Sequence, residues 1–324
     1  MNGGFTVKNK QTDLKKKESY FTRKYGRVVV KESKELYLML LPVAILIFLL
    51  SYVPLYGLVI AFQKYVPGAP LVSAKAKWVG FDNFLRFFNG RYFGRLLGNT
   101  LRLGVLNLLL GFPIPIIFAL LLNEIKNVRF KKVIQTVSYM PYFISTVVVA
   151  SIVLSFVSVD GLVNVILGVF GVEPKAYNLS PEAFSTIYLV TSIWKSFGWN
   201  SILYLSTMSS IDPALYESAK MDGANRMQMV FHITLPGIMP TVAMMLILSA
   251  GSVLGANSEL ILLLYNPTVY ETADVFGTFV YRDGLLNGGY SFGAAVNLFA
   301  TCVNFILLFI ANKISGWMTG NSLW

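Results

Sequence analysis

Residues 211–236 read IDPALYESAKMDGANRMQMVFHITLP. This polar stretch lies between two long apolar segments, at about 184–208 and 238–265. An apolar run of about 20 residues is long enough to cross the roughly 30 Å hydrocarbon core of a bilayer as a helix. The pattern therefore predicts a helical loop held at a membrane surface between two membrane-spanning segments.

The loop carries the signals of two helices joined by a turn. Asp212 is a good N-cap and Pro213 suits the first helical position, which predicts a short helix that runs to about Met221. Gly223 can supply a left-handed stop, and a second helix is expected to run from there toward Pro236. A short helix followed by a turn is a shape that can dock into a cleft on a soluble partner.

The composition of the whole chain indicates a polytopic membrane protein. Of its 324 residues, 55% are hydrophobic and 13% are charged, whereas a soluble globular chain has about 45–50% apolar and about 25% charged residues. A soluble enzyme, a disordered tail and a DNA-binding domain are therefore poor interpretations. The apolar runs show no alternation, so we expect an all-α integral membrane fold rather than a β-barrel. Six transmembrane helices are expected, at Leu36–Phe62, Leu97–Leu122, Val133–Val159, Phe184–Met208, Ile238–Tyr265 and Phe292–Ile314.

The placement of the basic residues predicts the orientation. The net charge is +11, and residues 1–35 hold ten Lys or Arg while the loop 123–132 holds four. The positive-inside rule then places both termini in the cytoplasm. The expected organisation is a basic cytoplasmic tail at 1–35, a transmembrane domain at 36–315 and a C-terminal tail at 316–324. The loop 63–96 is assigned to the opposite side, but it does not follow the rule, because it holds six basic residues: Lys64, Lys75, Lys77, Arg86, Arg91 and Arg95. Part of this loop is expected to form an interfacial helix.

The sequence offers little for catalysis or for binding a nucleotide. It has one cysteine, Cys302, and one histidine, His232, so an intrachain disulfide and a His-rich metal site are excluded, and no catalytic or metal-ligating residue is predicted. A Walker A loop ends in Gly-Lys followed by Ser or Thr, and the dipeptide Gly-Lys does not occur. Energy for any transport must come from another subunit or from an ion gradient.

The loop 211–236 also follows a fixed pattern. Seven positions carry it: Glu217, Ser218 and Ala219, then Gly223 after three residues, Ile233 after nine more, and Leu235 and Pro236 after one more. This pattern resembles the EAA loop of ABC importer permeases, with Ser218 where the family favours Ala. Asp222 before the glycine makes the loop resemble that of the carbohydrate-uptake branch of this family. The segments 81–84, 98–100 and 139–144 resemble its polysaccharide-permease group, and within that group the chain resembles the larger permease subunit of bacterial alginate importers.

This resemblance implies a type I ABC importer permease fold in the bacterial cytoplasmic (inner) membrane. The chain would form a heterodimer with a second homologous permease, and would bind two ATPase subunits, an extracytoplasmic solute-binding protein and an oligosaccharide, alginate or another acidic one. It would be no enzyme and hold no cofactor, because ATP and Mg²⁺ would bind to the ATPase subunits, and nucleic acid is not expected as a partner. The residues implied to contact the ATPase are Glu217, Ser218, Ala219, Asp222, Gly223, Ile233, Leu235 and Pro236.

Polar and aromatic residues within the spans are candidates for the translocation path. They are Lys195, Trp199, Asn200, Tyr204, Asn257, Glu259 and Asn297. Aromatic rings can stack on sugar faces, amides can bind hydroxyls, and Lys195 can meet the carboxylate of an acidic sugar. Equally, Trp199 fits an interfacial belt and Lys195 can snorkel to the membrane surface, while helix packing explains the asparagines and Glu259. The residues alone leave these interpretations open.

Two other functions are compatible with parts of the sequence. A proton-coupled secondary transporter would use Glu259 and Lys195, because ionisable groups inside a membrane are expensive and often functional. An integral-membrane enzyme acting on lipid or glycan would need a catalytic constellation, and His232 with scattered acids supplies no evident one. Neither rival predicts the pattern in the loop 211–236.

Overall fold

The computed structural model of the chain describes residue 34 and residues 36–71, 77–255 and 257–319. It forms two compact units, Met1–Val59 and Ile60–Trp324. Across the described residues the structure is helical, and β-structure is limited to an isolated bridge between Gln63 and Trp78. The all-helical fold class predicted from the sequence is therefore confirmed.

The helices are distributed along the whole described chain. The α-helices are α2 (Asp82–Phe88), α3 (Phe93–Gly111), α4 (Pro113–Asn123), α5 (Val128–Phe143), α6 (Thr146–Phe156), α7 (Leu162–Val169), α8 (Pro181–Ser209), α9 (Pro213–Met221), α10 (Arg226–Met229), α11 (Leu235–Ala250), α12 (Ser258–Leu264), α13 (Tyr270–Ala273), α14 (Phe276–Phe279) and α15 (Tyr290–Thr319). The π-helical elements are η1 (Phe48–Tyr52), η4 (Val230–Thr234) and η7 (Val280–Leu286). The 3-10 elements are η2 (Val53–Phe62), η3 (Tyr177–Leu179), η5 (Val253–Gly255) and η6 (Pro267–Val269).

Four helices within the described ranges are long and apolar enough to cross a membrane. They are Leu36–Phe62, Phe93–Asn123, Arg226–Ala250 and Tyr290–Lys313. The pair α5 and α6 adds a fifth crossing if its two halves, bent by 99°, form one span. Helix α8 has 29 residues, but its many polar side chains leave it outside this apolar set. The structure thus supports four or five of the six predicted crossings.

Two of the predicted spans are each divided into separate helices. The helix predicted at 238–265 already begins at Arg226 and ends at Ala250, and Asn257 caps the separate helix α12 by accepting a hydrogen bond from the N–H of Leu260 at 3.4 Å. The segment 133–159 bends where Ile144 adopts an extended backbone (ψ 133°) before the cap of α6. Hydropathy detects apolar runs but does not detect the caps that interrupt them.

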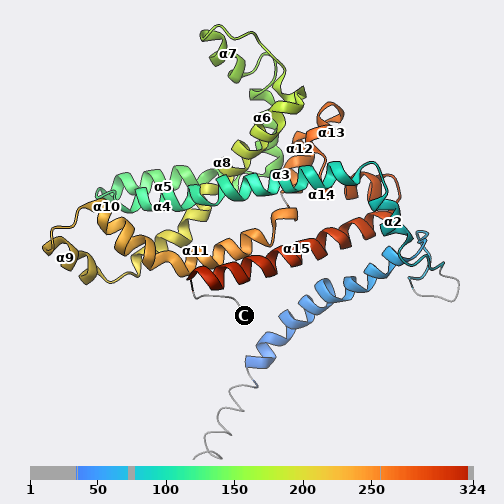
Figure 1. Ribbon diagram of the computed structural model, residues 1–324, viewed down its shortest axis with the longest axis horizontal. Coiled ribbons are helices and arrows are strands. Elements are labelled where there is room, and N and C mark those ends of the chain that lie inside the picture. The colour runs from blue at the N-terminus through green and yellow to red at the C-terminus, as the bar shows by residue number, and fades with distance from the viewer. Residues whose placement is uncertain (1–33, 35, 72–76, 256, 320–324) are drawn as a thin grey trace, which may run out of the picture. The chain divides into compact units, whose positions relative to one another are not determined.

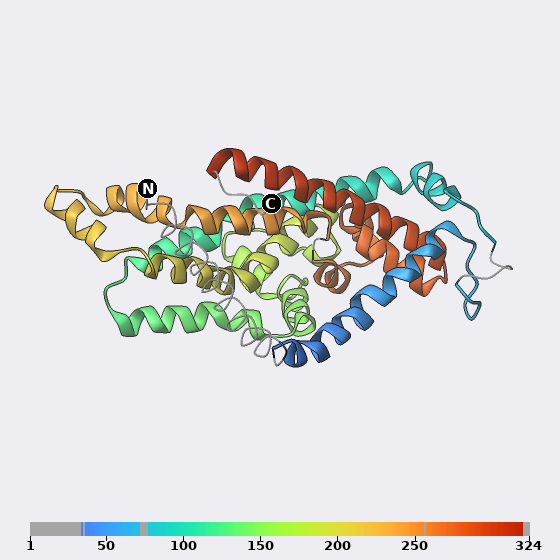
Figure 2. The same ribbon diagram turned by 90° about the horizontal axis from the view of Figure 1, so that it is seen from below.

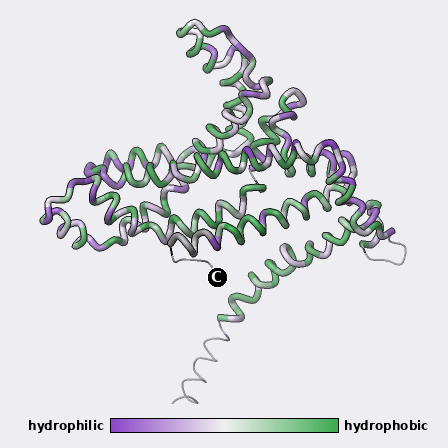
Figure 3. Tube along the Cα trace, in the orientation of Figure 1, coloured by the Kyte–Doolittle hydropathy of each residue, from purple (hydrophilic) through white to green (hydrophobic). Residues whose placement is uncertain are grey.

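Within the unit Ile60–Trp324, α9 lies at one end and α2 at the other, and we call these the α9 end and the α2 end (Figures 1 and 2). Hydrophilic residues gather at both ends, while the helices between them are largely hydrophobic (Figure 3). Helix α8 packs against α3, α4, α5 and α11. Buried Tyr204 and Ile238 join α4, α8 and α11 near the α9 end, and Phe87 and Phe276 join α2, α3, α14 and α15 at the α2 end.

Helices α5 and α8 approach each other closely at Gly198. A Cβ atom at this position would overlap the backbone carbonyl of Ser138 on α5. Small residues at helix crossings allow such contact between backbones in membrane proteins. The α5–α8 contact therefore depends on the missing side chain of Gly198.

Gly198→Ala is expected to lower the thermal unfolding temperature of the purified protein, because forcing an extra methyl group into a packed contact costs about 1–3 kcal/mol. The matched control is Gly98→Ala in α3, where a Cβ would meet no atom within 4 Å. That variant should keep or slightly raise the unfolding temperature, since Ala favours a helix over Gly by about 1 kcal/mol. Equal shifts for both variants would contradict the close approach.

Candidate functional site

The loop 211–236 folds as its capping residues predict. Helix α9 begins at Pro213, and the side chain of Asp212 accepts a hydrogen bond from the N–H of Ala214 at 2.9 Å. The second helix also forms, but it does not stop near Pro236, because α10, η4 and α11 continue one another as Arg226–Ala250. The loop therefore joins α8 directly to the long helix that ends in α11.

The end of α9 is closed by a glycine turn. Gly223 has φ +80°, in the left-handed region. Its N–H donates to the carbonyl of Lys220 at 3.1 Å, and the N–H of Ala224 donates to the carbonyl of Ala219 at 2.9 Å. These two bonds form a Schellman C-cap. The predicted glycine stop is confirmed, and it fixes the direction in which the chain leaves α9.

A concave surface lies between α9 and the following helix. The hydroxyl oxygens of Tyr216 and Thr234 are 2.9 Å apart and tie the two helices together. Beside this bond the loop encloses a pocket of about 320 Å³. Its lining residues are Ala219, Asp222, Gly223, Ala224, Gln228, Met229, His232 and Ile233. Four of the eight predicted coupling residues therefore surround one hollow.

The other predicted coupling residues lie beside this hollow. Glu217 and Ser218 are exposed on α9, and Leu235 and Pro236 are the first residues of α11. Four apolar side chains of the same loop are each more than half exposed: Leu215, Met221, Met227 and Phe231. Leu215 and Met221 lie on α9 itself, close in sequence to Glu217. Exposed apolar side chains on such a polar loop form a surface suited to contact with another protein.

A second feature is a cavity of about 130 Å³ inside the bundle. Its lining comes from α3, α4, α8, α11 and η5, and it carries no charged residue. The polar lining residues are Asn107, Ser196, Asn200, Tyr204, Ser249 and Ser252. Amides and hydroxyls can donate and accept hydrogen bonds, so this lining is chemically suited to the hydroxyl groups of a sugar.

The structure divides the path residues predicted on α8 between two faces. Asn200 and Tyr204 line the cavity, four residues apart on one face. Lys195 and Trp199 lie on the neighbouring face, against the bend between α5 and α6. The Lys195 ammonium donates to the hydroxyl of Thr146 at 2.7 Å, and the Trp199 ring stacks on Tyr142 with centroids 4.6 Å apart. These two side chains therefore hold the bend.

The remaining predicted path residues lie elsewhere. Asn257 caps α12, Glu259 is exposed in the first turn of that helix, and Asn297 is exposed on α15. None of them lines the cavity. The sequence analysis did not single out Asn107, although a polar residue inside an apolar helix is the signal that marks it.

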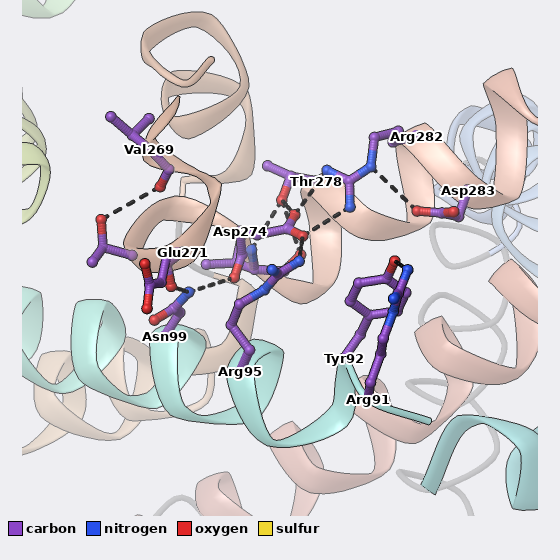
Figure 4. Close-up of polar contacts among 12 residues, drawn as sticks. Arg91, Tyr92, Arg95, Asn99, Val269, Glu271, Asp274, Thr278, Arg282 and Asp283 are labelled. Atoms are coloured by element: carbon purple, nitrogen blue, oxygen red, sulfur yellow. Dashed lines mark hydrogen bonds and ion pairs between the residues drawn. The ribbon is translucent and has the colours of Figure 1, made fainter. Parts of the chain in front are cut away.

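A buried carboxylate organises the α2 end (Figure 4). Asp274 is fully buried, with 0% of its surface exposed. It accepts hydrogen bonds from Arg95 at 3.0 Å, from Arg282 at 2.8 and 3.1 Å, and from the hydroxyl of Thr278 at 2.8 Å. The side-chain amide of Asn99 donates to the backbone carbonyl of Asp274 at 3.1 Å. This network fastens the segment between α12 and α15 onto α3.

The charges in this network stabilise each other. Burial by itself lowers the pKa of Arg282, but the hydrogen bonds and the negative charge of Asp274 outweigh burial and hold that pKa above its ordinary value. Arg282 therefore stays charged at physiological pH. A carboxylate with two guanidinium partners has its acceptor positions filled, which is what burial of a charge requires.

Known proteins are similar to this chain in sequence and in fold. Residues 111–318 match the family described as "Binding-protein-dependent transport system inner membrane component". The chain is 43% identical to the polygalacturonan/rhamnogalacturonan transport system permease protein YteP of Bacillus subtilis (strain 168) over 295 residues, which are 90% of this chain and 91% of that relative. Its fold is similar to a chain in the crystal structure of a bacterial ABC transporter involved in the import of the acidic polysaccharide alginate, with TM-score 0.82, 42% identity, and coverage of 90% of this chain and 98% of that chain. A crystal structure of a bacterial alginate ABC transporter in complex with an alginate pentasaccharide-bound periplasmic protein gives TM-score 0.83 and 41% identity, with coverage of 91% and 98%.

Asp274→Ala is expected to destabilise the protein strongly, because removing one partner of a buried ion pair leaves the other charge unpaired and costs about 3 kcal/mol or more. Thermal unfolding and limited proteolysis of the segment 266–289 would measure the loss. Asp283→Ala is the matched control, since Asp283 lies 3.3 Å from Arg282 but its side chain is 32% exposed. The control should change stability by about 1 kcal/mol or less, and a similar small effect of both variants would contradict the role of Asp274.

Proposed function

Because the chain belongs to the family of binding-protein-dependent transport system inner membrane components, we propose that it is one of two permease subunits of an ABC importer for acidic oligosaccharides. The resemblance that the loop 211–236 shows in the sequence is confirmed by this membership. The chain is a sugar ABC importer permease, a transport subunit that performs no catalysis itself. Its substrate, its partners and its path residues are the proposed part.

The observation that carries the proposal is the geometry of α9. A capped helix with an exposed carboxylate and exposed apolar side chains stands at the end of the bundle, next to a hollow lined by the coupling pattern. We expect an ATPase subunit to seat α9 there, with Glu217 paired to a basic group. The proposed complex has a second permease, two ATPase subunits that bind ATP and Mg²⁺, and an extracytoplasmic solute-binding protein.

The relatives of the chain favour an acidic substrate. Its relative YteP is described as a polygalacturonan/rhamnogalacturonan permease, and the similar structures are described as alginate transporters. Polymers of these kinds carry carboxylates on their uronate units. The uncharged cavity supplies groups for sugar hydroxyls, and Lys195 supplies a positive charge one residue from Ser196 in its lining. We place Asn200, Tyr204 and Lys195 on or next to the path.

The proposed topology has six crossings. Helix α8 would be the sixth, because a helix that lines the path at 181–209 needs polar side chains and is therefore less apolar than its neighbours. Both termini and the α9 end would face the cytoplasm, and the α2 end would face outward. The basic tail 1–35 lies almost entirely outside the described residues, and the transmembrane domain at 36–315 and the tail at 316–324 complete the proposed arrangement.

Glu217→Arg tests the ATPase contact. It should abolish uptake and co-purification of the ATPase subunits, while the amount of chain in the membrane and ligand binding by the solute-binding protein stay unchanged. Glu124→Arg reverses an exposed charge just after α4, outside α9, and serves as the matched control that should transport normally. Normal uptake by Glu217→Arg would refute the docking role.

Two variants of Lys195 separate its charge from its hydrogen bond. Lys195→Gln keeps a donor for Thr146 but removes the charge, and it should lower uptake of a uronate tetramer about tenfold, equivalent to about 1.4 kcal/mol, with a smaller effect on a neutral oligomer. Lys195→Ala also removes the donor, so it should lower uptake of both by loosening the bend. Equal effects of Lys195→Gln on charged and neutral oligomers would remove the electrostatic role.

A further inference from the structure

The basic residues of the loop 63–96 have no part in the function proposed above. In the proposed topology they face outward, where the positive-inside rule does not favour them. Lys64, Lys77, Arg86 and Arg91 are exposed, and among the described residues none of them pairs with a carboxylate; Lys75 lies outside the described residues. Neither topology nor internal ion pairing explains why these charges are present.

Three aromatic rings at the α2 end form a connected group that we call the aromatic platform (Tyr92, Phe279 and Phe292). Tyr92 precedes α3, Phe279 ends α14 and Phe292 lies in the first turn of α15. The centroids of Tyr92 and Phe279 are 5.7 Å apart, and those of Phe279 and Phe292 are 5.9 Å apart. Phe279 is buried, while Tyr92 and Phe292 are half-buried, so the platform joins three elements that are distant in sequence.

Four guanidinium groups lie over this platform. Arg86 lies 4.8 Å from the Phe292 centroid, and Arg282 lies 5.6 Å from the Phe279 centroid. The remaining two share one ring, since Arg91 and Arg95 lie 4.8 and 5.1 Å from the Tyr92 centroid. Cation–π contact of this kind holds a guanidinium in place without neutralising its charge.

Two of the four arginines are already neutralised. Arg95 and Arg282 share the carboxylate of Asp274, and Arg282 also pairs with Asp283. Against four arginines there are thus two paired acids, and the excess positive charge resides on Arg86 and Arg91. Asp82 is exposed on α2 near these residues in sequence, but it forms no ion pair with either of them.

Arg86 and Arg91 have the donors that a carboxylate needs. Arg91 donates to the hydroxyl of Tyr92, but a guanidinium has five N–H donors, and most remain for a ligand. Its fork matches the two oxygens of a carboxylate, and such bidentate pairs are stronger than neutral hydrogen bonds. Because both side chains are exposed and held over aromatic rings, they are preorganised to receive an anion from outside.

We propose that Arg86 and Arg91, held over the aromatic platform, bind the carboxylates of a uronate oligosaccharide as it reaches the outer entrance of the permease. This inference rests on the proposed function for the class of substrate and the outward orientation. Successive uronates of such an oligomer each present a carboxylate, so two arginines can engage one chain together. The site would retain the sugar between its release from the binding protein and its passage into the uncharged cavity.

The experiment measures binding of fluorescently labelled tetragalacturonate to the assembled transporter in lipid nanodiscs, without binding protein. Arg86→Gln/Arg91→Gln should weaken this binding at least tenfold, and the affinity of the wild type should fall steeply as salt is added. Lys126→Gln/Arg129→Gln removes two exposed charges at the other end of the bundle and is the matched control, expected to bind as the wild type does. Thermal unfolding and retention of the ATPase subunits establish that each variant is assembled.

Unchanged tetragalacturonate binding by Arg86→Gln/Arg91→Gln would overturn the proposal. If that variant also lost affinity for the ligand-free binding protein, the arginines would be assigned to protein docking instead. Uptake of tetragalacturonate by cells tests the outer site and the proposed function separately. If the wild-type system takes up the sugar and the arginine variants have no effect, only the outer site is refuted. If the wild-type system takes up none, the proposed substrate class is refuted.

Discussion

Helix α8 is the element on which the rest of this bundle depends. It packs against α3, α4, α5 and α11 at once. Two neighbouring faces of α8, offset by one residue along the helix, make different contacts. One face brings Asn200 and Tyr204 to the cavity, and the other brings Lys195 and Trp199 to the bend between α5 and α6. A rotation of α8 would therefore change the cavity and the bend together.

The same helix is tied to α9 by a very short connection. Helix α8 ends at Ser209 and α9 begins at Pro213, with Asp212 capping the start of α9. On its other side α9 turns at Gly223 into the helix Arg226–Ala250, whose Met245 and Ser249 also line the cavity. Since both connections are short and hydrogen-bonded, a force applied to α9 in the proposed complex reaches two walls of the cavity directly.

The sequence predicted local features well and long-range ones poorly. Asp212 and Gly223 act on residues within five positions of themselves, so their capping roles can be read from the chain. The exact positions of the breaks near Ile144 and Gly251 are harder to predict, because each lies within a long stretch that hydropathy treats as one span. Arg95 and Asp274 are 179 positions apart, and no local pattern marks them as partners. Lys195 and Trp199 were placed on the correct helix, but only the packing of α5 shows which face they occupy.

The distribution of charge has a consequence for transport. Across the described residues, cations are concentrated at the two ends of the bundle, while the cavity is lined by amides, hydroxyls and apolar groups. A cavity lined by arginines would bind a uronate chain tightly and release it slowly, and passage requires binding weak enough to leave. At the proposed outer site strong anion binding would be tolerable, because the carboxylates of one chain could be released one after another. In the proposed function, the positive charge of Lys195 next to the cavity wall would offset part of the cost of moving an anion through the cavity without holding it there.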